Sequence, residues 1–272
     1  MTREPSIKTK LHSALRERIK HPTDTRGYTK TPTENLVEGV SPDLFENDLR
    51  DGSGEELRMK FCAAHSSAAL AVNTFAWFKA PGRLPMLSVF GESGASALRL
   101  EKQFPIFNHG TPPNLDVWIE RDQDNIAIES KLTEYFTKTR PDFRPAYERL
   151  APPGLAEPCW WQVYEQAKSA EPRHLDVAQL VKHYFGLRKY HNGAVAKKPI
   201  RLLYLFWEPT NWQDIPVCQN HRREVDELAK LVASSTIKFT WMTYSQLWQE
   251  WSKSPNLIEH AKNLKDRYEI SA

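Results

Sequence analysis

The sequence has no long hydrophobic run and no sign of paired cysteines. No stretch approaches the roughly 18 consecutive apolar residues of a membrane-spanning helix, and the opening residues lack the apolar core of a secretory signal. Cys62, Cys159 and Cys218 lie far apart, without CxxC or Cys/His spacing. This pattern gives no basis for a disulfide framework or a zinc site. We therefore expect a cytoplasmic globular protein with ordinary thiols.

The sequence also lacks a large excess of either charge. The 37 Lys and Arg residues outnumber the 34 Asp and Glu residues by only three. This excess is too small to predict a nucleic-acid partner from the net charge. Any such prediction has to rest on where the charged residues lie along the chain. With 272 residues, of which 40% are hydrophobic, the chain is long enough to bury a substantial core.

The chain divides into an N-terminal arm and one larger domain. Residues 1–50 are polar and contain several prolines, so they predict an arm with one short helix near residues 8–19. Residues 51–272 predict a single domain with an insertion at 136–173. A long helix over 57–75 is expected because apolar residues recur there at spacings of three or four.

The domain alternates helical and strand-like segments. This order predicts an α/β fold with a central mixed sheet of four to five strands, flanked by helices in the order α-β-β-β-α-β and followed by extra C-terminal helices. The predicted strands are residues 97–104, with 86–90 as the less favoured alternative for this first strand, and residues 115–120, 125–131, 200–207 and 237–244. The predicted helices after the third strand are a short one at 159–170, within the insertion, and those at 175–191, 223–235, 245–253 and 255–270.

The strand at 125–131 ends in two charged residues on one face. Glu129 and Lys131 are two residues apart, so alternation places both side chains on the same side of a sheet. Burying a charge there is costly without a partner or a metal. The pair is therefore either a structural salt bridge at a strand end or part of a reactive site.

A third residue favours the reactive site. Asp116 lies near the start of the preceding strand, and hairpin pairing can bring it to the same end of the sheet as Glu129 and Lys131. Two carboxylates, completed by the backbone carbonyl of Ser130 and by waters, suit a hard divalent cation such as Mg²⁺. Such a metal can activate water for attack on a phosphodiester, while an adjacent lysine orients or deprotonates that water.

These residues resemble the motif of the PD-(D/E)xK nuclease superfamily, which has the restriction endonuclease fold. Asp116 and the "ESK" residues Glu129 and Lys131 would be the motif, although Leu115 stands where the motif has proline. The resemblance extends in element order over residues 51–245. The sequence is most similar to a family of restriction endonucleases in that superfamily, through "GEELRMKF", "HSSAALAVNTF", "GTPPNLDVWIE", "IESKLTEY" and "AQLVKHYFGL".

The resemblance implies an endonuclease that uses Mg²⁺, or Mn²⁺ in its place, to cut DNA. A homodimer would supply one active site for each strand of a duplex. The resemblance also implies a metal-binding glutamate on the first helix, and Glu56 fits this role better than Glu55. The alternative for Glu56 is a first-turn glutamate stabilised by the helix dipole. Glu101 either faces the same site or is an exposed strand residue.

The helix after the third strand supplies further candidates. Related nucleases place a Gln and a Tyr from this helix beside the active site, and Gln179 fits the first position. Tyr184 comes one residue later than the second position requires, and His183 and Lys182 share the Gln179 face.

A basic segment follows on the same helix and in the loop after it. It has no acidic residue, and aromatic residues are interleaved with its cations, which predicts contacts with nucleic-acid phosphates. The alternative is a solvated helix end and loop. The predicted nucleic-acid-binding residues are Lys182, Arg188, Lys189, Lys197 and Lys198, with Arg201 at the end of the segment.

Two other functions stay open at this point. One is a non-catalytic nucleic-acid-binding protein that keeps the nuclease fold. The other is a protein in which Glu129 and Lys131 merely pair at a strand end. The complete set of Asp116, Glu129 and Lys131 favours the enzyme, because a decayed site usually loses one member. Specificity would come from the arm at 1–50 and the insertion at 136–173.

Overall fold

The computed structural model describes residues 5–51, 60–195 and 197–272. Its centre is a five-stranded sheet with the strand order β1-β2-β3-β4-β5. The first three strands are antiparallel to one another, whereas β3, β4 and β5 run parallel. The predicted mixed α/β sheet is therefore confirmed. The strands are β1 (Ala95–Gln103), β2 (Asn114–Arg121), β3 (Asn125–Lys131), β4 (Ile200–Phe206) and β5 (Ile237–Thr243).

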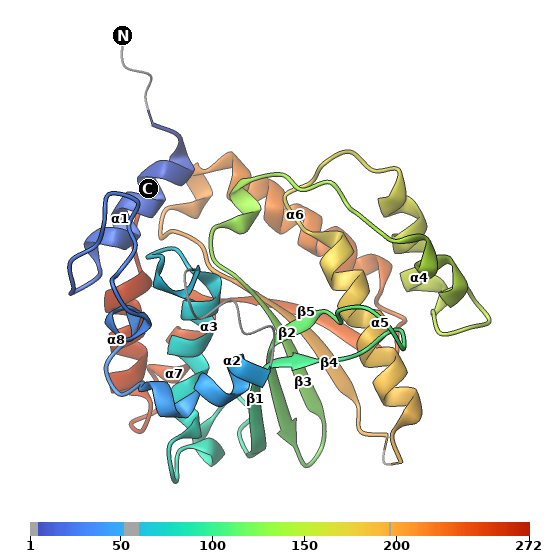
Figure 1. Ribbon diagram of the computed structural model, residues 1–272, viewed down its shortest axis with the longest axis horizontal. Helices are drawn as coiled ribbons and strands as arrows, with labels where there is room; N and C mark the ends of the chain where they lie inside the picture. Colours follow the sequence, from blue (N-terminus) through green and yellow to red (C-terminus); the bar gives the residue numbers. More distant parts are fainter. Residues whose placement is uncertain (1–4, 52–59, 196) are drawn as a thin grey trace.

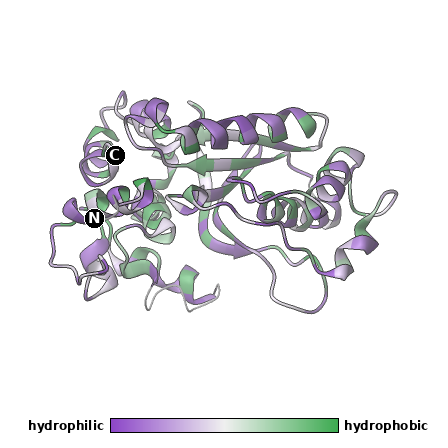
Figure 2. Ribbon diagram, turned by 90° about the horizontal axis from the view of Figure 1, so that it is seen from above, coloured by the Kyte–Doolittle hydropathy of each residue, from purple (hydrophilic) through white to green (hydrophobic). Residues whose placement is uncertain are grey.

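Helices cover both faces of this sheet (Figures 1 and 2). One face packs against α3, α7 and α8, and the other against α4, α5 and α6. Because β4 lies between two strands and under both layers, nearly all its residues are buried, as its continuous apolar sequence predicts. The α-helices are α1 (Ile7–Glu17), α2 (Glu46–Asp51), α3 (Ser67–Phe75), α4 (Pro158–Lys168), α5 (Val177–Gly193), α6 (Pro216–Leu231), α7 (Tyr244–Trp251) and α8 (Ile258–Tyr268).

The described part of the N-terminal arm packs on the face that α3, α7 and α8 cover. Leu11 and Leu15 of α1 are fully buried in that core. The Arg267 guanidinium of α8 donates to the Leu15 carbonyl at 2.9 Å, the Asn35 side chain at 2.9 Å and the Ala64 carbonyl at 3.0 Å. One buried cation thus joins the arm to the last helix.

None of the helices within the described ranges is long and apolar enough to cross a lipid bilayer.

The helix predicted over residues 57–75 is wrong in its first half. Within the described residues α3 begins only after Ser66, whose hydroxyl caps it. The Asn35 side chain donates to the carbonyls of Phe61 and Ala63, at 2.8 and 2.9 Å. Those carbonyls would be acceptors inside a longer helix, so hydrogen bonds to the arm replace helical ones.

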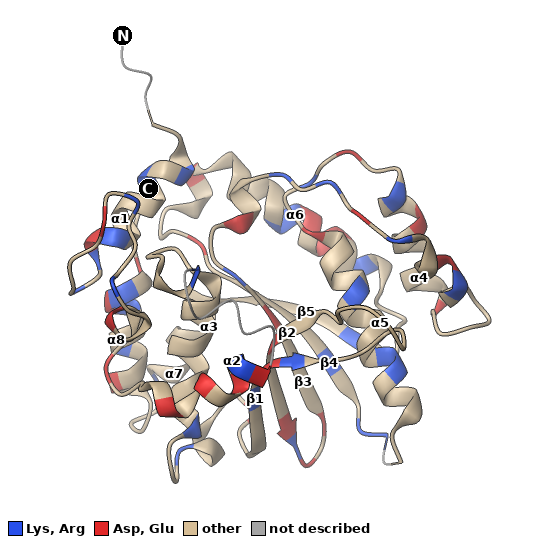
Figure 3. Ribbon diagram, in the orientation of Figure 1, with Lys and Arg blue, Asp and Glu red and all other residues tan. Residues whose placement is uncertain are grey.

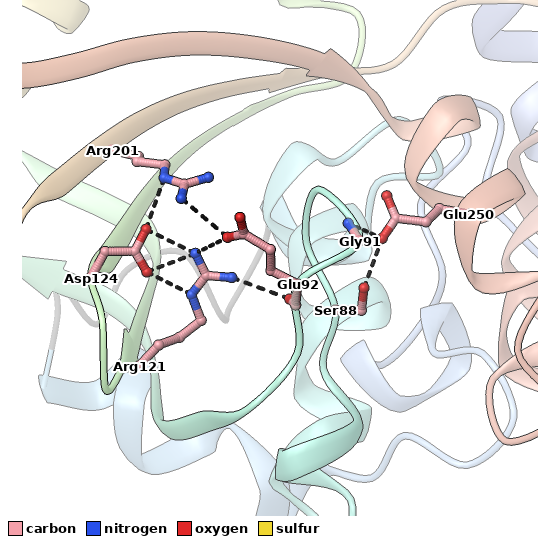
Figure 4. Close-up of polar contacts among 7 residues, drawn as sticks. All are labelled: Ser88, Gly91, Glu92, Arg121, Asp124, Arg201 and Glu250. Atoms are coloured by element: carbon pink, nitrogen blue, oxygen red, sulfur yellow. Dashed lines mark hydrogen bonds and ion pairs between the residues drawn. The ribbon is translucent and has the colours of Figure 1, made fainter.

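A charged network fixes the end of the sheet where β2 turns into β3 (Figure 4). The buried Asp124 carboxylate lies 2.6 Å from the Arg121 guanidinium and 2.8 Å from that of Arg201. Both arginines also contact Glu92, at 2.8 and 3.1 Å. Arg201 is therefore held by carboxylates at this hairpin, although the sequence grouped it with the basic segment.

Candidate active site

The β2–β3 hairpin brings Asp116 to the end of the sheet that carries Glu129 and Lys131. Val117 pairs with Ile128, so continuing this antiparallel register by one residue sets Asp116 opposite Glu129. A hydrogen bond from a backbone group to a side chain also joins β2 and β3, because the backbone N–H of Ser130 donates to the Asp116 carboxylate at 2.6 Å. The structure thus places all three charged residues at one site.

Helix α5 covers this site and contributes two side chains. Ala127 belongs to the core on the α5 face, so alternation directs Glu129 and Lys131 toward the same helix. The Lys131 ammonium lies 2.6 Å from Glu129 and donates to the Gln179 side-chain oxygen at 2.7 Å. His183, four residues after Gln179, places its Nε2 2.7 Å from the other Glu129 oxygen.

Glu129 is an anion held between two nitrogen groups inside the protein. Its side chain is 1% exposed, that of His183 is 2% exposed and that of Lys131 is 14% exposed. Burial raises the pKa of Glu129, but Lys131 and then His183 outweigh burial and lower this pKa to about 2. The carboxylate is therefore ionised across the physiological pH range.

The surroundings of Lys131 favour its protonated form. Burial favours loss of its proton, but the neighbouring carboxylates, Glu129 foremost, outweigh burial and raise the pKa of Lys131 above its usual range. Glu134 adds to this effect, and its carboxylate accepts from the Leu132 N–H at 2.7 Å. The resting site thus holds Lys131 as a positive charge.

Unlike Glu129, Asp116 has a pKa that its surroundings raise. Burial, then the charge of Glu129 and that of Glu101, raise the pKa of Asp116 well above its ordinary value, against the opposing effects of Lys131 and the Ser130 N–H. Two adjacent carboxylates resist joint ionisation, and a divalent cation between them would relieve this repulsion. The donor set of Asp116 and Glu129 therefore suits a hard cation with several retained waters.

Glu101 lies in β1 across from Asp116. The β1–β2 register pairs Leu100 with Val117 and Lys102 with Leu115, so Glu101 falls opposite Asp116. Its backbone has a φ of 51°, in the left-handed region that favours glycine. Within the described residues, no group of three or more His, Cys, Asp and Glu side chains is arranged to hold a metal. Glu55 and Glu56 lie outside the described residues.

Ser130 faces the other side of the sheet. Its hydroxyl lies 2.6 Å from the Tyr244 hydroxyl of α7, and both side chains are buried. This bond anchors the middle of the Glu129–Lys131 segment to the opposite helical layer. The two charged side chains are thereby held toward α5.

Basic residues are spread along α5 (Figure 3), and the predicted nucleic-acid-binding residues of this helix have different surroundings. Lys182 lies nearest to the site, and its ammonium is 5.8 Å from the centre of the Phe143 ring. Arg188 donates to the Thr236 hydroxyl at 2.8 Å, and Lys189 donates to the Ile106 carbonyl at 3.0 Å. Of these three residues, Lys182 is the nearest to Gln179 along the helix, less than one turn away.

Lys197 and Lys198 are not brought to the site. They precede β4, whose first residue pairs with Asn125, whereas its last residue pairs with Lys131. The two lysines are thus roughly 20 Å from Lys131 along the strand. Lys198 donates to the Arg121 carbonyl at 2.9 Å, at the hairpin of the charged network.

His183 is the site residue to which the sequence assigned no role. Its spacing of four residues from Gln179 places both on one helical face, a signal present in the sequence. The contact with Glu129 depends on how α5 lies over β3, which helical spacing does not reveal. Tyr184, the next residue, points away, and its hydroxyl accepts a hydrogen bond from the Glu157 backbone N–H at 2.8 Å.

Comparison with known families identifies the family of the chain. A family model described as REase-ARP, restriction endonuclease associating with ARP, matches residues 8–269, which is nearly the whole chain. No curated protein and no solved structure matches the chain.

Proposed function

Because the chain belongs to this family of restriction endonucleases, we propose that it is a Mg²⁺-dependent endonuclease that hydrolyses phosphodiester bonds of DNA. One observation carries the proposal. One end of the sheet brings together Asp116, Glu129 and Lys131. There Glu129 is buried and forms an ion pair with Lys131. Residues 51–272 would form the nuclease domain, with 1–50 as an arm packed on it.

The carboxylates of Asp116 and Glu129 and the carbonyl of Ser130 would hold the metal, with Mn²⁺ able to replace Mg²⁺. Glu56 is our candidate for an additional acid, on the resemblance alone. When bound, the metal would polarise the phosphoryl oxygen and lower the pKa of a water molecule. The protein side chains would bind the metal, orient the attacking water and balance the charge that develops on the phosphate.

Lys131 would act as an orienting cation. Its raised pKa opposes a role as a proton acceptor in the resting protein, whereas a fixed ammonium can hold a water and offset negative charge. Gln179 accepts a hydrogen bond from this ammonium and so steadies its direction. His183 would hold the Glu129 carboxylate in place, as outer groups do for ligands in metal sites.

DNA would approach over the part of α5 that begins at Lys182. Arg188, Lys189, Lys197 and Lys198 would provide weaker or more distant phosphate contacts, because most of them already have protein partners. A homodimer would bring a second active site to the other strand. The family description names an associated protein, ARP, and we extend that association to this chain.

A cleavage assay tests the proposal. Supercoiled and linear DNA, both modified and unmodified and from several genomic sources, are incubated with the protein and Mg²⁺, Mn²⁺ or EDTA. We expect metal-dependent cuts by the wild type and at least a 100-fold loss in Glu129→Gln and Lys131→Ala. Glu165→Gln, an exposed glutamate of α4, is the matched control and keeps full activity.

Three results would contradict the enzyme. Equal cutting by Glu129→Gln and the wild type would place the reaction elsewhere. DNA binding without metal-dependent cutting of any substrate would favour the non-catalytic binding protein. Neither binding nor cutting would leave Glu129 and Lys131 as a structural ion pair.

A further inference from the structure

A cavity of about 700 Å³ lies where the chain enters β2, the strand that carries Asp116. One wall is the loop 106–113, which leads directly into β2 and Asp116. The other wall is the 3₁₀ segment Pro145–Leu150 of the predicted insertion, and Lys182 of α5, three residues after Gln179, also lines the cavity. Pockets for small ligands occupy roughly 300–1,000 Å³, so the cavity has the size of a binding site.

In the part of the chain that the structure describes, the charged groups of the three cations that line this cavity are not bound by polar side chains or carbonyls. Within the described residues, the side chains of Arg144, Arg149 and Lys182 make no hydrogen bond and no ion pair, and the Lys182 ammonium lies only near the Phe143 ring. Asp142 is the one carboxylate among the lining residues, so the wall is net positive. Arg188 of the same helix, by contrast, is bonded to Thr236. Unpaired cations around a cavity suit an anionic group such as a phosphate.

The rings of Phe107 and Tyr147 line part of the cavity, and Phe143 packs beside them. Phe107 and Tyr147 meet edge to face with their ring centres 5.3 Å apart. Phe143 packs against Tyr147 at 5.8 Å and lies under the Lys182 ammonium. Phe107 is only partly buried, so its ring is accessible from the cavity. Nucleobases stack on such rings with little dependence on sequence.

We propose that this cavity, the nucleotide pocket, binds a single deoxynucleotide next to the cleavage point. The phosphate would lie on Arg144, Arg149 and Lys182, and the base would contact Phe107 and Tyr147. The cavity has room for a base that has left the duplex stack, which would allow the protein to recognise that base. As part of DNA cleavage, the pocket rests on the proposed function, but nucleotide binding itself needs neither metal nor reaction.

Binding of mononucleotides to the full chain in EDTA tests the pocket. The probes are the four 2′-deoxynucleoside 5′-monophosphates, with inorganic phosphate and the free nucleosides for comparison, measured by calorimetry. We expect at least one mononucleotide to bind at least tenfold more tightly than phosphate. Arg144→Gln and Lys182→Gln should each weaken this binding at least tenfold, whereas Phe107→Ala should weaken mononucleotide binding without changing phosphate binding.

Arg140→Gln is the matched control, because Arg140 is an exposed arginine of the same insertion outside the pocket. Equal binding of phosphate and all mononucleotides would overturn the base contacts, and no binding of either would overturn the pocket. The assay is separable from the nuclease proposal. DNA cutting without mononucleotide binding would refute the pocket alone, and mononucleotide binding without DNA cutting would refute the nuclease alone.

Discussion

At the scale of single residues, the contact between His183 and Glu129 makes the sharpest prediction. His183→Ala removes one of the two groups that fix the buried Glu129 carboxylate. Loss of such an outer partner typically lowers metal affinity by about 10–100-fold, and we expect a decrease of this size for Mn²⁺, measured by calorimetric titration. His191→Ala, a half-buried histidine two turns further along α5, is the control and should keep wild-type affinity. Unchanged Mn²⁺ affinity in His183→Ala would contradict the positioning role.

The residues of the site differ in how far the sequence could predict their placement. Alternation along β3 fixes that Glu129 and Lys131 share a face, and the short loop before β3 fixes the partner strand that carries Asp116. The distance from α5 to β3 depends instead on side-chain packing across the core. The contacts of Gln179 and His183 with this pair therefore required the structure.

At the scale of elements, the sequence predicted strands better than helix ends. Each strand of the sheet has its predicted position to within a few residues, because alternating or continuous apolar residues report burial directly. The predicted 57–75 helix is wrong because its backbone bonds to Asn35, which is distant in sequence. Pattern alone cannot show that competition between local and tertiary hydrogen bonds.

Glu157 joins α4 to the beginning of β5 and should be important for docking this helix. Its carboxylate accepts from the Ser235 hydroxyl at 2.6 Å and the Thr236 hydroxyl at 2.8 Å. Burial raises the pKa of Glu157, but the hydrogen bonds from Ser235 and Thr236 outweigh burial and lower it. Since the folded-state pKa is depressed, the stabilisation exists above the usual glutamate pKa and disappears as the pH falls below it.

We expect Glu157→Ala to lower the free energy of unfolding at pH 7 by about 2 kcal/mol, because hydrogen bonds to a charged group are lost. Urea denaturation measures this change, and the difference from wild type should stay constant down to the ordinary glutamate pKa and shrink only as the pH falls below it. Glu165→Ala, on the exposed side of α4, should change the free energy by less than about 0.5 kcal/mol. Equal effects of both substitutions would show that Glu157 does not dock the helix.

At the scale of the whole molecule, the two helical layers share a sensitivity to acid. His221 lies in the layer of α6, where burial, then His174 and Arg222, lowers its pKa to about 3. His260 lies in the opposite layer on α8, where burial lowers its pKa to about 4 against the hydrogen bond to the Thr74 carbonyl. Both imidazoles are therefore neutral in the folded protein at pH 5.

Unfolding exposes both histidines and restores a pKa near the ordinary 6.5. Below this pH the unfolded chain binds protons that the folded chain cannot, so the free energy of unfolding falls with pH, by about 1.4 kcal/mol per pH unit for each histidine. His260→Gln removes one of these two groups, so its free energy of unfolding should fall less steeply than that of the wild type between pH 6 and 4.5. Urea denaturation across this range, with His21→Gln in the exposed arm as the control, measures the two slopes. Parallel slopes for wild type and His260→Gln would mean that other groups cause the acid sensitivity.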